Sequence, residues 1–167
     1  MDAFRSILLP APEVGRLVDP FRRQGDWAWS HGVPAHLTLA GPFPLGTALP
    51  RGALGELAAE IRGTSYELAS VGMLGAALCL FPADDAPLLA WRDRVLALIG
   101  EPDRVDASWR PHLTVCRLDP ATGDTGAISQ ALERSLPIAC VAGGLLVAEM
   151  DVAGQARVIP LQPGRAV

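Results

Sequence analysis

Two short segments of the chain carry the same pattern of residues whose side chains can take part in catalysis. They read Pro-Ala-His-Leu-Thr-Leu (34–39) and Pro-His-Leu-Thr-Val (111–115), so each holds a histidine, a threonine two positions later and then an aliphatic residue. The chain has only three histidines. If threonine fills about 4% of positions, the chance that two of them are followed in this way is below roughly 1%. The pattern therefore indicates a site built from both segments.

A strand would bring the histidine and the threonine of each motif together. Residues i and i+2 of a strand project from the same face, so each threonine hydroxyl lies beside its histidine, while Leu37 and Leu113 point into a core. Imidazole titrates near neutrality, so one histidine can accept a proton while the other donates one. Threonine hydroxyls can donate hydrogen bonds to the oxygens of a phosphate held between them. The motifs predict acid–base phosphoester chemistry with no metal and no cofactor.

These motifs resemble those of the 2H phosphoesterase superfamily, and of its 2′-5′ RNA ligase-like branch in particular. The first motif is followed by Pro42-Phe43, and the second is flanked by Arg110 and Arg117, as in that branch. The resemblance implies a bilobal fold with the active site in a cleft between the lobes. It also implies hydrolysis of 2′,3′-cyclic phosphates or 2′-5′ phosphodiester bonds of nucleotides or RNA ends.

The resemblance further implies roles for single residues. Arg117 would be a supporting cation, although a regular strand places it on the face opposite His112 unless the strand twists or bulges. Phe43 fits a place in the cleft and a place in the core equally well. The roles implied are acid–base catalysis by His36 and His112, and substrate binding by Thr38, Thr114 and Arg117. We add Phe43 as a candidate substrate-binding residue.

Helices and strands must position these residues, and the spacing of apolar residues along the chain predicts where these elements lie. The two motifs are 112 − 36 = 76 residues apart, close to half of the 167-residue chain. Each falls in the second strand of a strand-helix-strand-helix-strand half. We predict an α+β fold of two pseudo-symmetric lobes, each with an antiparallel-rich sheet and flanking helices. The chain would be one bilobal domain over 1–167, with an internal repeat of about 4–72 and 75–161.

The predicted boundaries follow from the same reading. The segment 24–34 is expected to be a loop, with a turn region at 41–46 and a break at 72–75. Strands are predicted at 6–9, 35–40, 66–71, 76–81, 112–118, 138–141, 145–150 and 157–161, and helices around 14–21, 54–61, 88–98 and 128–132.

Composition limits the possible functions. The fourteen basic residues are all arginine, which excludes a P-loop and Schiff-base chemistry, because both need lysine. The net charge of −4 argues against binding long duplexes and fits a nucleotide or RNA end. Three scattered cysteines suggest a reducing compartment. A cytoplasmic monomer without a membrane segment is expected.

Two other functions remain open at this point. The chain could be a module that binds a nucleotide or phosphorylated metabolite without turning it over. It could also bind a metal through His31, His36 and His112, although threonine is a poor ligand and no carboxylate falls within the motifs. His31 lies near Trp27 and Trp29, and this group could cap the cleft or stack on a base.

Overall fold

The computed structural model describes residues 3–24, 26–100, 109–117 and 125–163. Helices and strands alternate along most of this length. In chain order the elements are β1 (Phe4–Pro10), α1 (Pro12–Arg22), α2 (Trp27–Ser30), β2 (His36–Pro44), α3 (Arg51–Ile61), β3 (Ser65–Leu74), β4 (Ala77–Pro82), α4 (Ala86–Leu98), β5 (Leu113–Arg117), α5 (Thr125–Glu133), β6 (Ile138–Val141), β7 (Leu146–Met150) and β8 (Ala156–Pro160).

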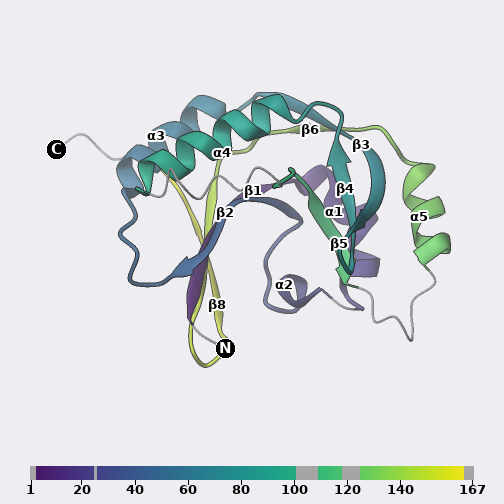
Figure 1. Cartoon of the computed structure of the whole chain (residues 1–167), viewed down its shortest axis with the longest axis horizontal. Coiled ribbons are helices and arrows are strands. Elements are labelled where there is room, and N and C mark those ends of the chain that lie inside the picture. Colours follow the sequence, from purple (N-terminus) through teal and green to yellow (C-terminus); the bar gives the residue numbers. More distant parts are fainter. Residues whose placement is uncertain (1–2, 25, 101–108, 118–124, 164–167) are drawn as a thin grey trace.

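The strands of the described residues form one eight-stranded sheet in the order β6-β3-β4-β5-β2-β1-β7-β8, with antiparallel neighbours throughout. At its centre β2 and β5 meet through the pair Leu37 and Leu113. The sheet divides there into two halves (Figure 1). We call β2, β1, β7 and β8 the first lobe, and β5, β4, β3 and β6 the second lobe. The predicted α+β fold is confirmed.

Each lobe contains strands from both halves of the sequence. β3 belongs to the first half but pairs with β4 and β6 of the second lobe. β7 and β8 come from the end of the chain and return to the first lobe, where β7 pairs with β1. The element order within each half agrees with the prediction apart from the added α2. The internal repeat of 4–72 and 75–161 stays a prediction.

Helices cover the sheet on the side away from the histidine motifs. α4 packs on β2 and α3 on α4, while α1 packs on β5 and β6 and α5 on β3 (Figure 1). The aliphatic residues of both motifs join the apolar side chains of these helices in one buried core. The aliphatic residues of the motifs in the two central strands are all fully buried: Leu37, Leu39, Leu113 and Val115.

Three predicted irregular stretches contain regular structure. The loop at 24–34 holds α2, and the break at 72–75 is the end of β3. Residues 45 and 46 form a turn, but the first part of the turn region predicted at 41–46 is wrong, because β2 continues to Pro44. Gly41 makes this possible, since it adopts a positive φ of 120° and a Cβ there would lie 2.5 Å from Ser6 Oγ. Glycine thus lets β1 and β2 stay close at this point. The predicted end of β5 at Leu118 lies outside the described residues.

The cysteines lie in the second lobe and are free and buried: Cys79 in β4, Cys116 in β5 and Cys140 in β6. Burial raises the pKa of the Cys79 and Cys140 thiols to about 11, which keeps both protonated at neutral pH. Neither is suited to act as a thiolate nucleophile. Within the described ranges, no helix combines the length and apolar character of a membrane span.

Candidate active site

The pairing of β2 with β5 arranges the two motifs crosswise. The central leucine of one motif is paired with the central leucine of the other. Because the strands are antiparallel, His36 lies across from Thr114, and Thr38 lies across from His112. All four side chains project from the face opposite the two leucines. The histidines are thus diagonal neighbours, which in a regular antiparallel pair are about 7–8 Å apart.

Both imidazoles are oriented by the same hydrogen bond. The Nδ1–H of His36 donates to the carbonyl of Pro34 at 2.7 Å, and the Nδ1–H of His112 donates to the carbonyl of Arg110 at 2.8 Å. A carbonyl can only accept, so this bond places a hydrogen on Nδ1 in both rings. Nε2 is therefore the atom that gains or loses a proton in each histidine. This equivalence fits two groups that act on one substrate.

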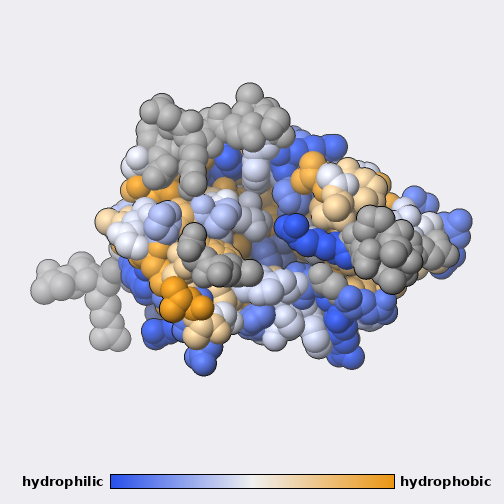
Figure 2. All heavy atoms as spheres, turned by 60° about the horizontal axis from the view of Figure 1, so that its bottom comes forward, coloured by the Kyte–Doolittle hydropathy of each residue, from blue (hydrophilic) through white to orange (hydrophobic). Residues whose placement is uncertain are grey.

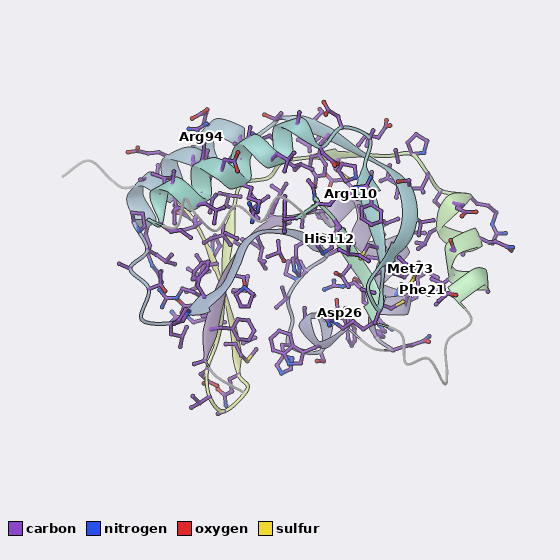
Figure 3. The ribbon with its side chains drawn as sticks, in the orientation of Figure 1. Phe21, Asp26, Met73, Arg94, Arg110 and His112 are labelled. Carbon is purple, nitrogen blue, oxygen red and sulfur yellow. The ribbon has the colours of Figure 1, made fainter. Side chains whose placement is uncertain are left out.

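A cavity of about 400 Å³ opens beside the motifs. Its walls come from β1, α2, β2, β5 and β7: Phe4, Ser6, Leu8, Asp26, Trp27, Ala28, Val33, His36, Thr38, Pro42, Thr114, Arg117 and Ala148. Four of the predicted site residues are therefore together. His112 is not among the lining residues; it is half-buried and lies between the lobes in the view of Figure 3. Figure 2 shows hydrophilic residues along the middle of this side of the molecule, with apolar patches to either side.

Arg117 reaches the cavity because β5 is bulged. Leu78 of β4 pairs with Cys116 while the next residue, Cys79, pairs with Thr114, so β5 holds one additional residue between these contacts. A bulge reverses the alternation of side chains beyond it. Arg117 consequently lines the same cavity as Thr114. This resolves the conflict between strand parity and the implied role of Arg117.

The structure does not support the assignment of Phe43 to the substrate site. Phe43 is 2% exposed, belongs to the core cluster and does not line the cavity. The register of β2 against β1 shifts twice between Thr38 and Phe43. The two shifts cancel, so Pro42 lies on the cavity face with Thr38 and Phe43 lies on the core face with Leu37. Regular alternation along the strand predicts the same placement.

A buried arginine next to the cavity was not anticipated from the sequence. Arg22, at the end of α1, is 1% exposed and donates to Asp26 Oδ2 through Nε at 2.6 Å. It also donates to Asp19 at 3.2 Å and to the carbonyl of Val33 at 2.9 Å. Asp26 caps α2 by accepting from the backbone N–H of Ala28 at 2.9 Å. The spacing of Arg22 and Asp26 allowed an ion pair, but only the fold shows that it is buried and anchors α2 beside the cavity.

The surroundings of His36 favour its neutral form. Desolvation is the largest influence, and it lowers the pKa of His36 below the ordinary value of 6.5. The hydrogen bond to Pro34 and the charge of Asp26 act in the opposite direction, whereas the charges of Arg22 and His112 lower the pKa further. At neutral pH the free Nε2 of His36 is therefore available to accept a proton.

The remaining histidine lies outside the cavity wall. His31 ends α2, where its Nδ1–H donates to the carbonyl of Trp27 at 2.8 Å. Among the described residues, no group of three or more histidine, cysteine, aspartate or glutamate side chains is arranged to hold a metal ion, so His31, His36 and His112 do not form one. Trp109 stacks on the guanidinium of Arg92 at 4.4 Å and lines a smaller cavity, which shares Thr38 and Pro42 with the first.

Comparison with known proteins gives the same fold over nearly the whole chain. Residues 10–152 match the family described as the 2′-5′ RNA ligase superfamily. The chain resembles the crystal structure of E. coli LigT complexed with ATP at a TM-score of 0.56 and 16% identity, covering 97% of this chain and 96% of that one. No curated protein matches it in sequence.

Two further solved structures agree. One is described as a phosphoesterase, with a TM-score of 0.55, 16% identity and 96% of each chain covered. The other is E. coli LigT complexed with 3′-AMP, with a TM-score of 0.52, 16% identity and coverage of 97% of this chain and 96% of that one. At this level of identity the likeness establishes the fold.

Proposed function

The chain belongs to the 2′-5′ RNA ligase superfamily, and from this membership and its crosswise histidine site we propose that it is a metal-independent phosphoesterase. Its proposed reaction is hydrolysis of 2′,3′-cyclic phosphate or 2′-5′ phosphodiester bonds in nucleotides or RNA ends. The proposal is supported above all by one observation. Both histidines use Nδ1 to bind the carbonyl two residues before them, which leaves each Nε2 to act on a substrate.

We assign the role of base to His36 and the role of acid to His112. The lowered pKa of His36 keeps its Nε2 unprotonated at neutral pH. In this scheme His36 takes a proton from water as the water oxygen attacks phosphorus. The bond from phosphorus to one ribose oxygen breaks, and that oxygen receives a proton from Nε2 of His112. One P–O bond forms and one breaks, and the two histidines exchange protonation states.

The threonines and Arg117 are proposed to hold the phosphate during this step. Thr38 and Thr114 line the cavity on either side of the β2–β5 junction, where their hydroxyls can donate to the non-bridging oxygens. Arg117 adds a positive charge on the same wall. Donors already in position stabilise charge that builds up on phosphate oxygens, and they need no reorganisation during the reaction.

Thr38→Ala and Thr114→Ala are each expected to lower kcat/KM by the equivalent of about 1–3 kcal/mol, the worth of one hydrogen bond to a charged group. The measurement is steady-state hydrolysis of a 2′,3′-cyclic nucleotide. Thr64→Ala is the matched control, because Thr64 is exposed and does not line the cavity. Equal losses in all three variants would contradict a phosphate-binding role for the motif threonines.

Nucleotides or RNA ends are the proposed substrates and partners. The titles of the E. coli LigT structures name ATP and 3′-AMP as ligands of that protein, which supports a nucleotide here. The acidic net charge supports the view that long duplexes are not bound. We further propose that the protein acts as a monomer, with its three buried thiols suited to a reducing cytoplasm.

The proposal is tested by incubating the purified protein with a panel of 2′,3′-cyclic nucleotides, cyclic-ended oligonucleotides and 2′-5′ dinucleotides in the presence of a chelator. Products are identified by ³¹P NMR. Hydrolysis that disappears in the His36→Ala and His112→Ala variants is the expected result. Tight nucleotide binding without turnover would instead identify a binding module.

A further inference from the structure

The cavity continues beyond the reactive residues into an apolar end. The histidine, the threonines and Arg117 occupy the wall nearest the β2–β5 junction. The rest is mainly apolar and comes from β1, α2, β2 and β7: Phe4, Leu8, Trp27, Pro42 and Ala148. The hydroxyl of Ser6 lies on the same wall. A mostly apolar pocket with a few polar groups, of about 400 Å³, is typical of a small-molecule site.

Trp27 is the largest side chain at this end, and it is 38% exposed. Its ring contacts Phe4 in a tilted arrangement with centroids 5.9 Å apart, and it lies against His31 at 4.5 Å with an angle of 33° between the planes. Trp27 is not part of the buried core. A tryptophan on the wall of a cavity, held in place by contacts with neighbouring rings, presents a flat apolar surface to a ligand.

The position of Trp27 is fixed by a buried ion pair. Trp27 is the first residue of α2, directly after the capping Asp26. Asp26 is in turn held by the buried guanidinium of Arg22 at 2.6 Å. A buried ion pair is expensive in desolvation and needs good geometry to offset that cost. Here it holds the indole at the cavity before any ligand arrives, which lowers the entropy lost on binding.

We propose that Trp27 is the stacking surface of a nucleoside subsite, and that it sets the preference of the enzyme for substrates that carry a nucleobase. This inference rests on the proposed function, because it places the phosphate of the same ligand at the histidines. A planar ring that is uncharged and has polar edges suits the site, with Trp27 against its face and the hydroxyl of Ser6 near its edge. Stacking accepts every base, so the subsite favours nucleotides over base-free phosphates more than it distinguishes one base from another.

The test compares binding of adenosine 2′-monophosphate and inorganic phosphate by calorimetry, using wild type, Trp27→Ala, Trp27→Phe and Trp29→Ala. Trp27→Ala is expected to raise the Kd of the nucleotide by about 10–100-fold and to leave the Kd of phosphate unchanged. Trp27→Phe should restore most of the loss. Trp29→Ala is the matched control, since Trp29 belongs to the same helix but contacts Arg23 and does not line the cavity. It should change neither constant.

Other results separate the subsite from the reaction. If Trp27→Ala weakens both ligands by the same factor, or neither, the subsite is wrong even if the enzyme hydrolyses cyclic nucleotides. If binding depends on Trp27 as expected but wild type hydrolyses no member of the substrate panel, the subsite is supported and the proposed reaction is wrong. If wild type binds neither ligand, both are wrong.

Discussion

Replacing His36 or His112 with alanine is expected to lower kcat on a 2′,3′-cyclic nucleotide by about 10²–10⁴, the range for loss of one acid–base group. The reason is that each ring offers one oriented Nε2. One acts as base and the other as acid on opposite sides of the phosphate, so neither can replace the other. The double variant should lose far less than the product of the single losses, because the two groups act as a unit. Steady-state kinetics at saturating substrate measure these effects.

His31→Ala is the matched control for these variants. It removes the third imidazole of the chain, which ends α2 and does not line the cavity. Its kcat should stay close to that of wild type. A comparable loss in His31→Ala, or strictly multiplicative losses in the double variant, would argue against a shared mechanism of His36 and His112.

Arg22→Ala is expected to lower the free energy of unfolding by about 3–5 kcal/mol, as is usual when one partner of a buried ion pair is removed. The guanidinium is 1% exposed and bonds Asp26, Asp19 and the carbonyl of Val33. Without it, the Asp26 carboxylate remains largely buried and loses its counter-charge. Arg22→Lys should recover only part of the loss, because one ammonium cannot reproduce the fork that binds three acceptors. Urea unfolding measures the difference.

The neighbouring Arg23 provides the comparison for Arg22. It is exposed, and its guanidinium stacks on Trp29 at 5.1 Å from the ring centre. Arg23→Ala should therefore cost less than about 1 kcal/mol. If both arginine variants unfold at the same urea concentration as wild type, the buried pair does not anchor α2. Arg22→Ala should also raise the pKa of His36, because the arginine charge lowers it in the wild-type protein.

Much of the site could be predicted because it depends on residues that are close together in the sequence. The His-x-Thr spacing and the strand period place each threonine beside its histidine, and the intervening leucines are buried as expected. The alternation of strands and helices also follows from periodicity, and it fixes the α+β class. A resemblance carried by two short motifs was sufficient to indicate the family.

The remaining features depend on pairing between distant segments. Periodicity does not say that β3 joins the second lobe and that β7 returns to the first, since pairing partners are set by the whole sheet. One additional residue in β5 brings Arg117 into the cavity. Local patterns do not reveal such bulges. The burial of Arg22 likewise follows only from how α1, α2 and the strand β2 pack together.

The pH dependence of kcat/KM, measured with a chelator present, tests the central claim most directly. One histidine must be neutral and the other charged, so the profile should be a bell. Because the pKa of His36 is lowered, the acid-side limb should fall below pH 6.5, and activity should rise with pH through that limb. The limbs belong to the coupled pair, and the single histidine variants show which limb each residue governs. A bell unchanged by the chelator is the predicted result. A single alkaline limb, abolished by chelation, would mean that a metal hydroxide attacks phosphorus and that the paired-histidine account is wrong.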